Sequence, residues 1–180
     1  ERVHGFKRMM SCPIRPEDVV ADLIVCTHEH LDHMDVDALP QIAKNGRTHF
    51  AGPVECVKAF SSMGIPEHRC DALGVVLDFA GIKAYHTGDT AYRPERFRPA
   101  IAMKPDVLIP CINGRYGNLT AEEAAELVAS AKPDLAIASH FWMFVEHGGD
   151  PGLYLESCRR LAPEVRAIVM KPGEQVQYAK

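Results

Sequence analysis

Residues 28–33 read His-Glu-His-Leu-Asp-His and place three imidazoles and two carboxylates within six positions, directly after an apolar stretch. Side chains two apart on extended backbone point to the same face, so His28 and His30 can bind one ligand together. Asp32 and His33 follow at a turn, from which they can reach a neighbouring position. Imidazole nitrogen with carboxylate oxygen suits zinc, iron or manganese better than magnesium or calcium. The segment therefore predicts a transition-metal site, and a solvated histidine-rich loop is the alternative.

Two later segments also end an apolar run with a polar side chain. Tyr85-His86 leads into Thr87-Gly88-Asp89, and the run 135–139 ends at His140. Each has an ordinary explanation by itself, since aspartate is common in turns and a histidine often ends a strand. Together with residues 28–33, however, carboxylates and imidazoles at separate strand ends can converge on one pair of ions.

The elements that must position these residues follow an α/β pattern, in which short apolar runs alternate with helical periodicity. We expect strands at residues 22–27, 48–51, 75–79, 82–86, 106–111, 135–139 and 165–170. We expect helices at residues 36–44, 53–62, 94–102, 121–131 and 151–161. Thr120 and Glu123 have the spacing of a capping box, which predicts that a helix begins after Thr120.

Composition limits the class of protein. With 180 residues, 47% of them hydrophobic, the chain can form one domain with a single core. Its net charge of −4, without a Lys/Arg run, argues against a nucleic-acid partner. No stretch has the roughly 18 apolar residues of a membrane span, and no signal peptide is visible. Six scattered cysteines without a CxxC pair favour reduced thiols and a cytoplasmic protein. Homo-oligomer formation is left open.

These motifs, in this order, resemble the metallo-β-lactamase superfamily and, within it, the L-ascorbate-6-phosphate lactonase group. The matching text is THEHLDHMDVDAL, HFAGP, GIPEHRC, YHTGDT, INGRYGNLTAEEAAEL and the late SH. The resemblance implies an α/β fold, an αββα sandwich of two mixed β-sheets flanked by helices, with the site at one edge of the sheets. It also implies one or two divalent ions, manganese or zinc.

The resemblance also implies a role for each candidate ligand. His28 and His30 would bind the first metal, Asp32, His33 and His140 the second, and Asp89 would bridge the two. Members of the superfamily usually supply a third histidine to the first metal. Here the intervening histidines are His49, His68 and His86, and none of them matches that position; His86 could support a ligand instead.

The chain is also shorter than the superfamily pattern. The residues around 73–75 pass almost directly from one strand region to the next, where the family has several more strands. We therefore expect a single metallo-β-lactamase-fold domain over residues 1–180 that lacks segments near residues 73–75 and before Glu1.

The implied reaction is hydrolysis by a metal-bound hydroxide, shared between two ions about 3.5–4 Å apart. It would open a lactone of a phosphorylated sugar acid, a small molecule such as L-ascorbate 6-phosphate. Asp32 would orient the hydroxide and take up its proton, and Asp89 completes the catalytic pair. Asn113 and Arg115, in a glycine-containing turn, could bind the phosphate; the alternative is a turn with a solvated arginine.

Two other functions remain open at this stage. The same metal pair could hydrolyse a phosphodiester or another ester or amide, or the chain could be a non-catalytic binding module of the same fold. No Gly-x-Ser-x-Gly segment supports a serine hydrolase. The aromatic residues Phe141, Trp142 and Phe144 favour an ordinary hydrophobic cluster over a pocket wall. His147, next to Gly148 and Gly149, could reach a substrate, but the pattern favours an ordinary loop histidine.

Overall fold

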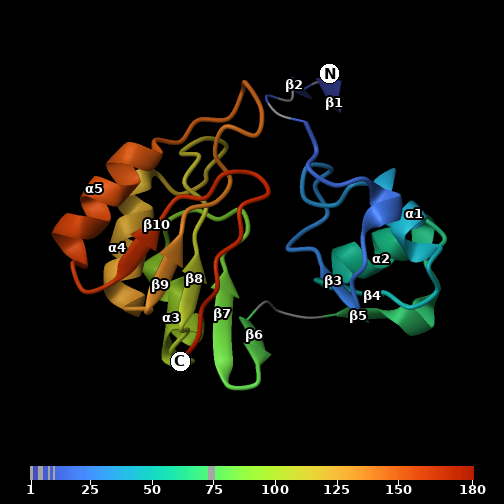
Figure 1. Ribbon diagram of the computed structural model, residues 1–180, viewed down its shortest axis with the longest axis horizontal. Coiled ribbons are helices and arrows are strands. Elements are labelled where there is room, and N and C mark those ends of the chain that lie inside the picture. The colour runs from blue at the N-terminus through green and yellow to red at the C-terminus, as the bar shows by residue number, and fades with distance from the viewer. Residues whose placement is uncertain (1, 4–5, 8, 10, 73–75) are drawn as a thin grey trace. The chain divides into compact units, whose positions relative to one another are not determined.

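The computed structural model describes residues 2–3, 6–7, 9, 11–72 and 76–180 (Figure 1). The chain divides into a larger unit, Glu1–Ser11 with Val76–Lys180, and a smaller unit, Cys12–Val75. The predicted gap near residues 73–75, like residue 1, lies outside the described residues. Both units combine strands with helices, and the predicted α/β class is confirmed.

The larger unit is built on a mixed five-stranded sheet with the order β10-β9-β8-β7-β6. Its strands are β6 (Val76–Phe79), β7 (Ile82–His86), β8 (Val107–Ile109), β9 (Leu135–Ile137) and β10 (Arg166–Ile168). Strands β7 to β10 are parallel, and β6 pairs antiparallel with β7. The β6–β7 turn contains Ala80 and Gly81, both with positive φ, which matches the twist of a tight hairpin. A separate antiparallel ladder joins β1 (Arg2–Val3) to β2 (Phe6–Lys7).

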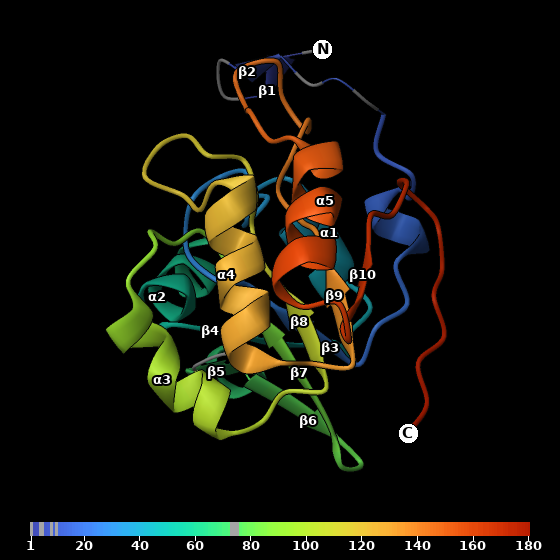
Figure 2. The same cartoon turned by 90° about the vertical axis from the view of Figure 1, so that its left-hand side faces the viewer.

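Helices α3 (Pro94–Ala102), α4 (Ala121–Ala131) and α5 (Pro151–Leu161) complete this unit. Figure 2 shows α4 and α5 side by side over one face of the sheet. The predicted capping box is confirmed, since the Glu123 amide donates to Thr120 Oγ1 and the Thr120 amide donates to the Glu123 carboxylate. The core includes the fully buried side chains of Leu108, Ile112, Leu127, Val128 and Tyr154.

The smaller unit has a parallel three-stranded sheet with the order β3-β4-β5. Its elements are η1 (Pro16–Asp18), β3 (Leu23–Val25), α1 (Ala38–Ala43), β4 (His49–Gly52), α2 (Val54–Ser62), η2 (Glu67–Arg69) and β5 (Cys70–Ala72). Phe50, Cys56 and Phe60 are fully buried in its core. Burial raises the pKa of the Cys26 thiol to about 12, so this thiol stays protonated at neutral pH.

Cysteines 12, 26, 56, 111 and 158, which the structure describes, are all free thiols. Across the described ranges, every helix is too short or too polar to cross a membrane.

The side chain of Asp106, just before β8, interacts both with strand β7 and with Lys180 at the end of the described chain. Its Oδ2 accepts a hydrogen bond from the Lys83 backbone N–H at 2.7 Å, and its Oδ1 lies 2.9 Å from Lys180 Nζ. The Lys83 hydrogen bond, followed by that of Lys180, lowers the pKa of the Asp106 carboxyl. A carboxyl with a lowered pKa stabilises the fold above its unfolded pKa of about 3.9, and this contribution is lost as pH falls through the folded value.

We therefore expect Asp106→Asn to unfold more easily than the wild type at pH 7, with a difference that shrinks as the pH falls below about 4. Urea unfolding followed by circular dichroism at pH 7, 4 and 3 measures this. Asp37→Asn removes an exposed carboxylate of the smaller unit and is the matched control, expected to change the free energy of unfolding by less than about 0.5 kcal/mol. A difference for Asp106→Asn that stays constant over this pH range would contradict the prediction.

Candidate metal centre

The histidine-rich segment of the smaller unit forms a tight turn after β3. The Cys26 amide donates to the Ala51 carbonyl at 2.8 Å and so continues the pairing with β4. Beyond it the chain leaves the sheet, and the amides of His33 and Met34 both donate to the His30 carbonyl, at 2.9 and 2.8 Å. These hydrogen bonds fold residues 30–34 back on themselves, which brings His33 beside the start of the segment.

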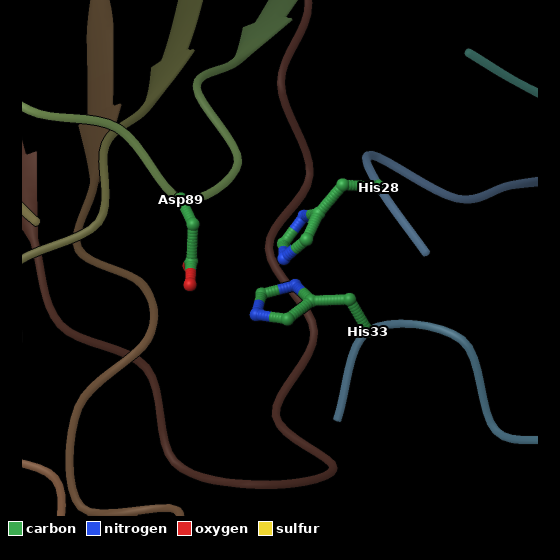
Figure 3. Close-up of side chains that lie close together, drawn as sticks. All are labelled: His28, His33 and Asp89. Atoms are coloured by element: carbon green, nitrogen blue, oxygen red, sulfur yellow. The ribbon is translucent and has the colours of Figure 1, made fainter. Parts of the chain in front are cut away.

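This turn gathers the four predicted ligands of the smaller unit. The His28 ring centroid lies 4.1 Å from that of His33, and Figure 3 shows the two rings side by side. The His28 ring centroid also lies 4.6 Å from that of His30, and Thr27 Oγ1 is 3.0 Å from His28 Nδ1. Asp32 Oδ2 is 3.4 Å from His33 Nε2. His30 is exposed, whereas the other three side chains are half-buried.

In the larger unit, hydrogen bonds within the loop after β7 set the position of Asp89, whose carboxylate is drawn in Figure 3. The Gly88 amide donates to His86 Nδ1 at 3.0 Å. Thr87 Oγ1 accepts from the Cys111 amide at 3.1 Å and donates to the Gly88 carbonyl at 2.9 Å. Gly88 is buried with a φ of +60°, a conformation that glycine adopts without strain. His86 thus accepts a hydrogen bond from the turn that carries Asp89, and its predicted support of a metal ligand stays a prediction.

His140 comes to the same edge of the larger sheet because β7, β8 and β9 are parallel and their carboxyl ends meet there. Asp89 Oδ1 lies 3.3 Å from His140 Nδ1. His140 has a φ of +56°, and left-handed backbone at a non-glycine residue is a feature that clusters at functional sites. These two strand ends therefore lie together, whereas the predicted convergence on a pair of ions stays a prediction.

The loop after β8 carries the predicted substrate-binding residues to this edge. Asn113 is almost fully buried, with 1% of its surface exposed. Its side-chain nitrogen and oxygen both lack a hydrogen-bond partner within the part of the chain that the structure describes. Arg115 is exposed, and its guanidinium donates to the Glu146 carbonyl at 3.4 Å. Asn113 is thus a buried polar group at the sheet edge, and Arg115 is a cation beside it.

The sequence favours an ordinary loop position for His147 over contact with a substrate. In the structure His147 is buried to 8% exposure, and its ring centroid lies 4.7 Å from that of His140. The Gly148-Gly149 pair that follows it lets the chain turn back toward the sheet edge, and this pair is the sequence signal for that position.

Each unit therefore presents imidazole nitrogens together with a carboxylate oxygen, the donor set that zinc, manganese and iron take. These donor sets fit a divalent metal ion. Three histidines were considered as the third ligand of the first metal. His49 and His68 are exposed, and His86 accepts a hydrogen bond from the turn that carries Asp89. None of the three is assigned as that ligand.

Comparison with known proteins agrees with this chemistry. The model of the beta-lactamase superfamily domain matches residues 6–140. A "UPF0173 metal-dependent hydrolase" of Archaeoglobus fulgidus is 27% identical over 206 residues, which covers 94% of this chain and 87% of that protein. Among solved structures, the metallo hydrolase Igni18 from Ignicoccus hospitalis has a TM-score of 0.73 at 21% identity, covering 89% of this chain and 80% of that one. The isothiocyanate hydrolase from Delia radicum gut bacteria has a TM-score of 0.75 at 17% identity, covering 99% and 85%. Both structural likenesses concern the fold.

Proposed function

Since the chain belongs to the beta-lactamase superfamily and matches metal-dependent hydrolases along nearly its whole length, we propose that this metal-dependent hydrolase is a lactonase. Its proposed substrate is the lactone of a phosphorylated sugar acid, such as L-ascorbate 6-phosphate. The observation that carries the substrate class is the loop after β8, which brings Asn113 and Arg115 to the sheet edge where Asp89 and His140 lie.

The proposed metal ligands are the side chains already grouped within each unit. They are His28, His30, Asp32 and His33 in the smaller unit, and Asp89 and His140 in the larger one. One or two divalent ions, manganese or zinc, are the proposed cofactors. When bound, such ions lower the pKa of a coordinated water toward about 7 and polarise a carbonyl oxygen.

The chain's own residues then orient the reactants and move a proton. Asp32, whose carboxylate lies 3.4 Å from the His33 ring nitrogen, orients the attacking water and accepts its proton. General-base assistance of this kind contributes typically about 10²–10⁴-fold in rate. Asp89 keeps a negative charge beside His140 and is held in place by the Thr87-Gly88 turn.

Arg115 and Asn113 are the proposed phosphate-binding residues. A guanidinium can pair with two phosphate oxygens at once, which an ammonium group cannot do. The buried amide of Asn113, which lacks a partner among the described residues, can donate to a third oxygen. A ligand that satisfies such a buried polar group gains a hydrogen bond.

The first experiment is turnover of L-ascorbate 6-phosphate by the full chain with manganese or zinc, beside γ-butyrolactone as a lactone without phosphate. His30→Ala is the matched inactive control. Arg115→Met is expected to lower kcat/KM for the phosphorylated lactone by about 10–100-fold, the loss of a charged hydrogen bond, and to leave γ-butyrolactone turnover unchanged.

Other outcomes identify the alternatives. Turnover of bis(p-nitrophenyl) phosphate without turnover of either lactone would replace the lactonase by a phosphodiesterase. A protein that binds metal but hydrolyses none of these compounds would overturn the lactonase proposal and direct the search to other esters and amides. A protein that binds no metal would favour the non-catalytic binding module.

A further inference from the structure

His147 occupies a built position in the loop between β9 and α5. Its ring packs edge-on against Phe144, with centroids 5.0 Å apart, and its backbone N–H donates to the Phe144 carbonyl at 3.1 Å. Tyr116, from the loop after β8, lies 6.2 Å from it on another side. Only 8% of the residue is exposed. The imidazole is therefore held by neighbours from two loops, unlike a histidine on a solvated loop.

Tight backbone packing fixes the return of this loop. A Cβ at Gly148 would lie 2.4 Å from the Asn113 carbonyl oxygen, and one at Gly149, whose φ is +104°, would lie 2.6 Å from Phe141 Cβ. The Trp142 indole N–H donates to the Gly149 carbonyl at 3.0 Å. Neither glycine position has room for a side chain, because the loop packs closely against the sheet edge. This packing places His147 next to His140.

The larger unit consequently carries three candidate metal-binding side chains, with His140 next to each of the other two. Asp89 Oδ1 is 3.3 Å from His140 Nδ1, and one ring nitrogen of His140 lies within 4.8 Å of one of His147. Two nitrogens bound to one ion at about 2.0–2.1 Å are at most about 4.2 Å apart, so the two rings must come closer together when they bind one ion. Two histidines with one carboxylate form a ligand set that holds divalent zinc and iron in catalytic sites with open positions.

We propose that His147 is a third ligand, with Asp89 and His140, of a divalent ion bound by the larger unit. This inference rests on the proposed metal chemistry, but assigns a ligand that neither the strand-end pattern nor the superfamily resemblance supplied. Packing against Phe144 does not require a histidine, because an apolar aromatic ring would pack there equally well. Only an imidazole places a nitrogen atom next to His140.

The test is cobalt(II) binding to the full chain, measured by calorimetry and by proton magnetic resonance. In the cobalt-loaded protein each bound imidazole can give a shifted ring N–H signal. The key variant is His147→Phe, which keeps an aromatic ring against Phe144 but removes both nitrogens. We expect one site to lose affinity by at least about 100-fold, since residues that merely support a ligand already cost about 10–100-fold. One shifted N–H signal should disappear, and the other site should be unchanged.

His68→Phe makes the same substitution at an exposed position of the smaller unit and is expected to bind cobalt like the wild type. If His147→Phe does not fold, His147→Asn replaces it and is expected to lose the same site and signal. Wild-type affinity with all shifted signals retained in either folded variant would overturn the role of His147 and leave Asp89 and His140 as proposed ligands. A wild-type chain that binds no cobalt would overturn the proposed function itself, and this inference with it.

Discussion

Replacement of Asp89 by alanine is expected to abolish hydrolysis and to weaken divalent-metal binding by at least about 100-fold. The carboxylate lies 3.3 Å from the His140 ring nitrogen, and the Thr87-Gly88 turn positions it there. Its removal takes away the negatively charged ligand, so that only neutral imidazoles remain to hold the ion. Calorimetric titration with manganese or zinc, together with turnover of the proposed substrate L-ascorbate 6-phosphate, measures both effects on one preparation.

Two further variants separate the proposed ligand role of Asp89 from other effects of a lost carboxylate. Asp89→Asn keeps the size of the side chain and is expected to lose activity as Asp89→Ala does, because an amide supplies no charge. Asp78→Ala removes a carboxylate of the β6–β7 turn, where Asp78 accepts a hydrogen bond from the Gly81 amide at 2.9 Å. It should retain metal binding and turnover. Retained turnover in Asp89→Ala would show that the metal assignment is wrong.

The arrangement of Asp89 and His140 could be predicted from sequence because it depends on regular elements. Both residues end apolar runs of the period expected for buried strands, and parallel strands separated by helices place their carboxyl ends at one edge. The strand of residues 82–86 and the helices of residues 94–102, 121–131 and 151–161 were predicted with the observed bounds. For these elements the apolar runs, the helix-start signals and the strand-end residues all indicated the same α/β arrangement.

The place of His147 could not be predicted in the same way, since it depends on irregular backbone. His140 and Trp142 both adopt positive φ, a conformation that sequence patterns do not announce at non-glycine residues. The close approach of Gly148 to the Asn113 carbonyl is a contact between two loops far apart in the chain. Strand β5 (Cys70–Ala72) was missed for another reason, because three residues are too few to show a period.

The largest expected effect on stability is that of Leu108→Ala in the larger unit. Leu108 is fully buried in β8, the middle strand of the five, where it is paired with Tyr85 on one side and Ala136 on the other. Truncation of a buried leucine removes its transfer free energy and leaves a cavity, which together cost about 2–5 kcal/mol. A domain with about 5–15 kcal/mol of stability would lose a large part of it.

Urea unfolding followed by circular dichroism measures this loss, with Met103→Ala as the matched control. Met103 is 43% exposed, and its truncation should change the free energy of unfolding by no more than about 0.5 kcal/mol. Below the unfolding transition of Leu108→Ala, its affinity for metal should equal that of the wild type, because the strand ends that carry Asp89 and His140 remain paired to β8. Asp89→Ala should behave in the opposite way, with metal binding lost and the fold retained. A loss below about 1 kcal/mol for Leu108→Ala would mean that the core of the larger unit is not centred on β8.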